Sequence, residues 1–116
     1  MLNSEKESAL SKERIRDLND AFRITFQGGK VVVTQSISEM EPAVQAAIFA
    51  TVRNFKDFNE DNDPHGEHDF GAFEFAGEKF FWKIDYYDPS LQFGSEDPSD
   101  PMQTTRVLTI MRASEY

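Results

Sequence analysis

The densest group of chemically active side chains lies in residues 61–71. This segment, Asp-Asn-Asp-Pro-His-Gly-Glu-His-Asp-Phe-Gly, contains both histidines of the chain and four of its carboxylates. One proline and two glycines interrupt these side chains, which is typical of a turn. Residues of these types can bind a metal ion, transfer protons or simply stabilise a turn. The segment therefore predicts a site with three alternative roles.

A metal site here would use His65, Glu67 and His68 as ligands. Two histidines and a carboxylate are a known ligand set for zinc, manganese or iron(II). Their spacing differs from the helical His-Glu-x-x-His pattern, and Pro64 and Gly66 oppose a helix in this segment. We therefore expect no cofactor and keep a divalent metal as the alternative.

Proton transfer would use His65 or His68, with Asp85 among the carboxylates that could orient the imidazole. The chain offers no marked nucleophile, because it has no cysteine and no serine in a Gly-x-Ser-x-Gly turn. Hydrolysis by activated water is the chemistry that remains, so the alternative function is a small metal-assisted hydrolase. In the third role, the Asn and Asp side chains bond the turn's own backbone and the segment is purely structural.

Negative charge is concentrated in the second half of the chain. Residues 1–56 carry a net charge of +1, whereas residues 57–116 carry −10. No Lys or Arg occurs in residues 57–78, which hold eight acids, or in residues 84–105, which hold five. Such a surface repels phosphate, so we expect no direct contact with nucleic acid. The complementary partner is a basic protein surface or a divalent cation.

The leading prediction is a non-enzymatic binding or accessory protein that engages a basic surface on another macromolecule. Mimicry of nucleic-acid charge, as in an inhibitor of restriction or CRISPR machinery, is one form of this function. Binding through exposed carboxylates should weaken as salt rises. The predicted binding residues are all acidic and all lie in the second half of the chain: Asp61, Asp63, Glu67, Asp69, Asp88, Glu96, Asp97 and Asp100.

Apolar spacing predicts two helices. The first runs from residue 11 to the glycines at 28 and 29, and the second opens between residues 38 and 42 and continues to about residue 55. Pro42 suits the first helical position, where its missing N–H costs nothing. The apolar stripe of the first helix consists of Leu10, Ile15, Leu18, Phe22 and Phe26.

Four strands are predicted around these helices. Residues 30–36 are rich in β-branched side chains, residues 70–75 and 79–87 flank a short glycine-containing turn, and residues 104–111 form the last strand. In the third strand, Phe80, Trp82, Ile84 and Tyr86 should face the core, which places Asp85 on the opposite face with Lys83. The fold class is therefore α+β, with two helices packed on one face of a largely antiparallel sheet of about four strands.

A chain of 116 residues has room for one domain. We expect residues 1–10 to be disordered or frayed and residues 11–116 to form the single α+β domain. No apolar run approaches the roughly 18 residues of a membrane span, and the charged start does not resemble a secretory signal. The sequence therefore predicts a soluble cytoplasmic protein with no membrane partner.

Two longer motifs resemble those of a bacterial protein family. They are Asn-Asp-Pro-His-Gly-Glu-His-Asp-Phe-Gly at residues 62–71 and Phe-Phe-Trp-Lys-Ile-Asp-Tyr-Tyr-Asp at residues 80–88, followed by Arg-Val-Leu-Thr-Ile-Met at 106–111. From about residue 14 to residue 116, the chain is similar to the family known as domain of unknown function 3768. This resemblance implies no reaction, cofactor or partner.

Overall fold

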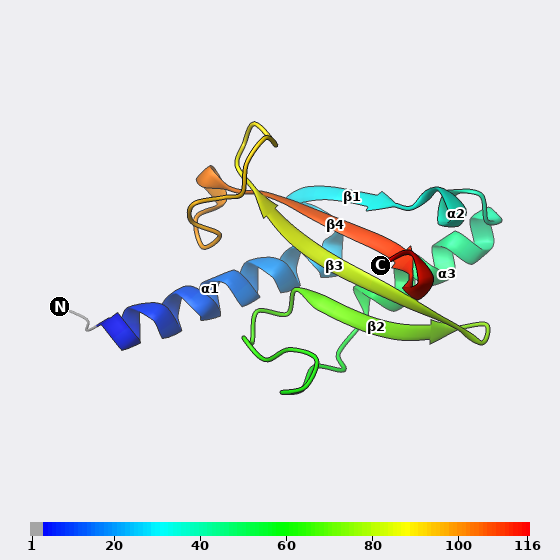
Figure 1. Ribbon diagram of the computed structural model, residues 1–116, viewed down its shortest axis with the longest axis horizontal. Coiled ribbons are helices and arrows are strands. Elements are labelled where there is room, and N and C mark those ends of the chain that lie inside the picture. The colour runs from blue at the N-terminus through cyan, green and yellow to red at the C-terminus, as the bar shows by residue number, and fades with distance from the viewer. Residues whose placement is uncertain (1–3) are drawn as a thin grey trace.

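A mixed four-stranded sheet with helices on one face forms the body of the protein, in a computed structural model that describes residues 4–116 (Figure 1). The strand order is β1-β4-β3-β2, with β1 parallel to β4 and the other neighbours antiparallel. The predicted α+β class is confirmed. The elements are α1 (Ser4–Thr25), β1 (Gly29–Val33), α2 (Gln35–Ser38), α3 (Pro42–Arg53), β2 (Phe70–Phe75), β3 (Glu78–Tyr87), β4 (Thr105–Arg112) and the 3₁₀ turns Pro101–Gln103 and Ala113–Glu115.

The first helix begins earlier than predicted, whereas α3 begins at the predicted Pro42. Helix α1 begins at Ser4, so residues 4–10 are helical, and the predicted fraying of residues 1–3 lies outside the described residues. Leu10 is 48% exposed because the first turns of α1 extend past the sheet (Figure 1). Residues 35–38 form the separate short helix α2, and α3 then starts at Pro42, the position favoured by the sequence. No helix within residues 4–116 is long and apolar enough to cross a membrane.

The predicted hairpin is confirmed. Strands β2 and β3 are joined by Ala76 and Gly77, whose φ angles are 52° and 78°. Two successive positive φ angles define the tight turn that matches the natural twist of paired strands. The second position costs little because glycine has no Cβ.

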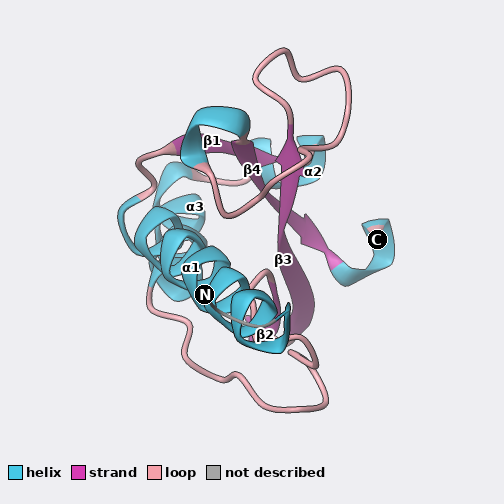
Figure 2. Ribbon diagram, turned by 90° about the vertical axis from the view of Figure 1, so that its left-hand side faces the viewer, coloured by secondary structure: helices cyan, strands magenta, loops and turns pink. Residues whose placement is uncertain are grey.

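The core lies between the helices and the face of β3 that the alternation predicted. Phe80, Trp82 and Ile84 are at most 3% exposed and pack in one cluster with Phe22 of α1 and Val52 of α3. Each such side chain contributes about 1.5–3 kcal/mol through its removal from water. The opposite face of the sheet carries the other residues of β3, whereas α1 and α3 lie on the core side (Figure 2). The C-terminal 3₁₀ turn contacts β3, and Tyr116 beyond it packs on the outer-face rings of Phe70 and Phe81.

The topology brings the two acidic connections to one end of the sheet. Neighbouring strands among β2, β3 and β4 run in opposite directions. The start of β2, the end of β3 and the start of β4 therefore lie at the same end of the sheet. Residues 54–69 lead from α3 to β2, and residues 88–104 lead from β3 to β4. Both connections therefore lie at the same end of the sheet, which we call the loop end. Figure 2 looks onto this end and shows the two connections on either side of α1.

Candidate functional site

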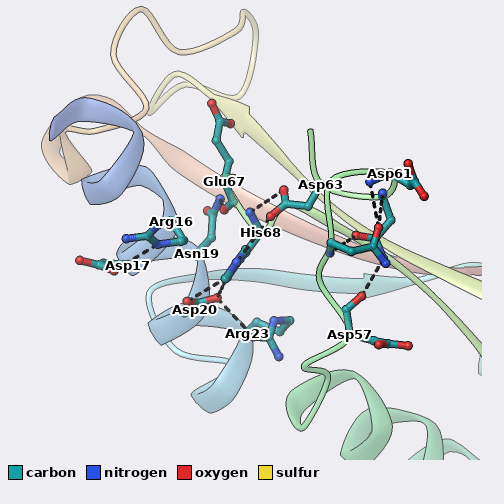
Figure 3. A network of polar contacts seen from close by, with 12 residues as sticks. Arg16, Asp17, Asn19, Asp20, Arg23, Asp57, Asp61, Asp63, Glu67 and His68 are labelled. Atoms are coloured by element: carbon teal, nitrogen blue, oxygen red, sulfur yellow. Dashed lines mark hydrogen bonds and ion pairs between the residues drawn. The ribbon is translucent and has the colours of Figure 1, made fainter. Parts of the chain in front are cut away.

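His68 lies within residues 61–71, the segment that contains both histidines, and it joins this segment to α1. Its backbone has a φ of 54°, and its N–H donates to Asp63 Oδ1 at 3.1 Å. The ring lies between two carboxylates: Nδ1 is 2.9 Å from Asp20 Oδ1, and Nε2 is 3.5 Å from Asp63 Oδ2 (Figure 3). Asp20 is on α1, 48 residues earlier in the chain. The imidazole thus connects the helix to the segment.

The imidazole of His68 has a partner on each side. Nδ1 lies within hydrogen-bond distance of Asp20, and Nε2 faces Asp63 at ion-pair distance. One face of the ring is stacked on Phe58, with centroids 3.8 Å apart and planes 4° apart. Both ring nitrogens therefore face carboxylates.

The three residues of the alternative metal set have different surroundings. His65 is exposed, and His68 faces Asp20 and Asp63. Glu67 Oε1 accepts a hydrogen bond from the Tyr86 hydroxyl at 3.0 Å. Over the described part of the chain, no group of three or more histidine or acidic side chains has an arrangement that could hold a metal ion.

Asp85, the third predicted catalytic residue, does not accompany the histidines. It lies on the outer face of β3, where its Oδ2 is 2.6 Å from the Lys83 ammonium. His68 packs on the core side with Phe58 and α1. The predicted position of Asp85 on the same face as Lys83 is confirmed, and the carboxylate that contacts the imidazole from α1 is Asp20.

A buried hydrogen-bond hub, formed by Asn19, Arg106, Tyr86 and Glu67, fixes the loop end. Asn19 is fully buried, and its amide donates to the Tyr86 hydroxyl at 2.8 Å and to the Glu67 carbonyl at 2.9 Å. Its carbonyl accepts from Arg106 Nε at 2.7 Å. Arg106 also donates to the carbonyl of Pro98 at 2.5 Å. The hub therefore holds residue 67 of one acidic connection and residue 98 of the other against α1.

Burial controls the protonation of two hub members. Removal from water raises the pKa of the Tyr86 hydroxyl, so this group keeps its proton and can donate to Glu67. Burial also lowers the pKa of Arg106, while Tyr86 and Glu67 act in the opposite direction. Arg106 lies 5.2 Å from the centroid of the Tyr86 ring, which stabilises the cation further. Neither Asn19 nor Arg106 was among the site residues predicted from the sequence.

The C-terminal ends of α1 and α3 stabilise each other through two arginines. Arg23 of α1 donates to the carbonyls of Val52 and Arg53 at 3.0 and 3.2 Å, and Arg53 donates to the carbonyl of Ile24 at 2.9 Å. Helix C-termini attract cations because their last carbonyls are unpaired. A cavity of about 360 Å³ opens beside these ends, lined also by Asp20 and His68. Its two arginines already serve as helix caps.

The family comparison covers most of this architecture. The family model described as "Protein of unknown function (DUF3768)" matches residues 33–115. The chain belongs to this family. The match includes both acidic connections, Arg106 and His68, but begins after α1, which supplies Asn19 and Asp20. No curated protein and no solved structure matches the chain.

The eight predicted binding carboxylates all lie at the loop end or where β3 enters it, but they differ in accessibility. Asp61 and Glu96 are exposed. Asp63 is buried against His68, which removes it from the accessible surface. In residues 9–116, the only ion pair formed by any of the eight is that between Asp63 and His68. Arg16, a base of α1, pairs with Glu13 and Asp17 of its own helix.

Three of these carboxylates brace residues 88–104. Asp88 accepts a hydrogen bond from Ser90 Oγ at 2.8 Å, and Asp97 accepts one from Ser99 Oγ at 2.5 Å. Asp100 accepts one from the backbone N–H of Met102 at 2.9 Å. Hydrogen bonds from Ser90 and from Gln103 are the main causes that lower the pKa of Asp88 and of Asp100. Both groups therefore remain negative well below neutral pH.

Asp69 is the acidic residue whose charge strains the fold most clearly. Partial burial is the main cause that raises its pKa, followed by the nearby charge of Glu67. The ionised form is thus disfavoured in the folded state, so stability is lost as pH rises through the raised pKa. Asp69→Asn should raise Tm at neutral pH by about 2–4 °C, a modest gain because the group remains partly exposed to water.

Thermal unfolding at two pH values tests this effect of Asp69. The gain from Asp69→Asn should vanish at a pH below the pKa of an ordinary carboxyl group. There the aspartate is protonated in the folded and the unfolded state, so it is as neutral as the asparagine. Asp61→Asn, which removes an exposed carboxylate from the same connection, is the control. A destabilised Asp69→Asn variant at neutral pH would show that the ionised carboxylate supports the fold.

Proposed function

We propose that the protein is a non-enzymatic binding protein whose loop end engages a basic surface on another macromolecule. The single observation that carries this proposal is that residues 54–69 and 88–104 both lie at one end of the sheet, on either side of α1. The chain between Asp57 and Asp69 and between Asp88 and Asp100 contains no Lys or Arg. Two segments of one sign at the same end of the sheet create a potential that attracts positively charged groups.

The opposite end of the molecule supports this assignment by contrast. There, Arg112 forms an ion pair with Glu78, and its backbone N–H donates to Glu115. Glu115 also accepts from Thr34 and Ser36, both at 2.9 Å. Glu78 and Glu115 at this end serve the fold, whereas Asp57, Glu60 and Asp61 at the loop end are exposed.

The side-chain geometry favours binding over catalysis. Both ring nitrogens of His68 face carboxylates, and Asp85 is held by Lys83 on the far side of the sheet. A general base needs a free lone pair within reach of its substrate. The partner follows from charge alone: a protein surface rich in Lys and Arg, of which the nucleic-acid groove of a restriction or CRISPR protein is one example.

A titration with a fluorescent hexa-arginine peptide tests the proposal. Fluorescence anisotropy should show binding that weakens about tenfold from low to physiological ionic strength, because exposed charges are screened by salt. A hexa-citrulline peptide, which has nearly the same shape without the charge, is the matched control and should not bind. Duplex DNA should not bind either, because its phosphates meet carboxylates.

Two results would contradict the proposal. One is an affinity for hexa-arginine that does not change with salt. The other is equal binding of the arginine and citrulline peptides, since that would assign the interaction to the backbone or to apolar contacts.

A further inference from the structure

A hollow in the surface of residues 88–104 combines apolar walls with negative charge. It has a volume of about 300 Å³ and is lined by Pro89, Phe93 and Met102 together with Asp88 and Glu96. Phe93 is 70% exposed and Met102 is 84% exposed, the latter the highest value among the large hydrophobic side chains described as exposed. Two large apolar side chains that meet around one hollow indicate a contact surface.

The backbone holds Phe93 in this outward position. Asp88 N donates to the Phe93 carbonyl at 2.8 Å, and Asp88 Oδ1 accepts from Gln92 N at 3.2 Å. Leu91 has a φ of 63°, and Gly94 forms an isolated bridge with Tyr87 of β3. The loop is therefore ordered around the hollow, and binding there requires little additional ordering.

The charges around the hollow are all of one sign. Asp88 remains ionised because Ser90 and the loop backbone hydrogen-bond its carboxylate, which lowers its pKa. Glu96 is exposed and forms no hydrogen bond or ion pair within the described part of the chain. No Lys or Arg lines the hollow. A cationic group can therefore enter without displacing an existing partner.

We infer that this hollow receives one arginine side chain from the partner. The methylene stem of an arginine would pack on Met102 and Pro89, and its flat guanidinium would lie on the Phe93 ring while donating to Asp88 and Glu96. Lysine has a compact, strongly hydrated charge that stacks less well on a ring, so arginine is the better fit. This inference rests on the proposed function and adds the position and chemistry of its central contact.

Methyl and amide NMR spectra of the full chain, titrated with hexa-arginine, test the inference. The Met102 methyl and the Phe93 and Gly94 amide resonances should shift saturably. Hexa-citrulline should cause no shift, and hexa-lysine should bind about threefold more weakly than hexa-arginine.

Substitutions at the hollow provide a second measurement on the same peptide. Phe93→Ala should weaken hexa-arginine binding about five- to tenfold, and Phe93→Leu should fall in between because it keeps an apolar wall without the ring. Leu91→Ala is the matched control, since Leu91 is 41% exposed on the same loop but does not line the hollow. It should leave the affinity unchanged.

The outcomes separate this inference from the proposed function. Salt-dependent binding of hexa-arginine that shifts only resonances of residues 57–69 would overturn the arginine site in the hollow. That result would leave the proposed binding surface at the loop end intact. Equal effects of Phe93→Ala and Leu91→Ala would also overturn the hollow. If hexa-arginine does not bind at all, both proposals fail.

Discussion

Replacing Arg106 with alanine should destabilise the protein by about 3 kcal/mol or more. Arg106 is 3% exposed and bonds Asn19 and the Pro98 carbonyl. Its removal leaves the buried Asn19 carbonyl without its donor and opens a cavity beneath Tyr86, and each defect costs about 1–3 kcal/mol. Urea denaturation of the wild type and the variant measures the loss.

Arg112→Ala is the matched control for Arg106→Ala. Both arginines lie on β4 and both occupy core-facing register positions, opposite Tyr86 and Phe80 respectively. Arg112 is more exposed and pairs with Glu78, and such a partly exposed ion pair contributes about 1 kcal/mol or less. If the two variants lose the same stability, the hub does not hold the loop end as described.

Gly71→Ala should also destabilise the fold by about 3 kcal/mol or more. A Cβ at this position would collide with Trp82 Nε1, and it would lie 2.6 Å from Trp82 Cε2 and 2.8 Å from Phe55 Cζ. Both neighbours are buried aromatic rings in the core, so neither can move away cheaply. Urea denaturation again provides the measurement.

Gly94→Ala separates this steric effect from a general effect of glycine replacement. A Cβ at Gly94 would have the Tyr86 carbonyl at 3.9 Å as its nearest neighbour, an ordinary contact distance. Its stability should change by less than about 0.5 kcal/mol. A Gly71→Ala variant as stable as Gly94→Ala would mean that β2 packs differently against Trp82.

The fold was predictable where it follows from local pattern. The alternation in β3 identified the buried set of Phe80, Trp82 and Ile84, and the short turn near Gly77 identified the hairpin. Pro42 marked the start of α3. The early start of α1 was not predicted because residues 4–9 contribute nothing to its apolar stripe, and a helix end exposed to water needs no such stripe.

The polar hub was not predicted because its members are far apart in the sequence. Asn19 is 87 residues from Arg106 and 67 from Tyr86. A signal was nevertheless present: Asn19 lies on the apolar stripe of α1 between Ile15 and Phe22, and Arg106 continues the alternation of Leu108 and Ile110. A polar residue at a core position must find a buried partner.

The candidate site was predicted in composition but not in arrangement. The segment around His68 does concentrate polar contacts, yet its main carboxylate partner, Asp20, comes from α1. Strand alternation correctly placed Asp85 on the outer face of the sheet, and that position separates it from His68. Spacing along the chain indicates which side chains are available, whereas their convergence depends on packing between distant elements.

The most direct test of the account compares two pairs of charge-removing substitutions in the hexa-arginine titration. Asp61→Asn with Glu96→Gln removes two exposed carboxylates from the loop end, and Glu41→Gln with Glu74→Gln removes two from the opposite end of the sheet. The first pair should weaken binding about tenfold and the second less than about twofold, although the net charge changes equally. Equal losses would show that the peptide responds to total charge, which would contradict a binding surface at the loop end.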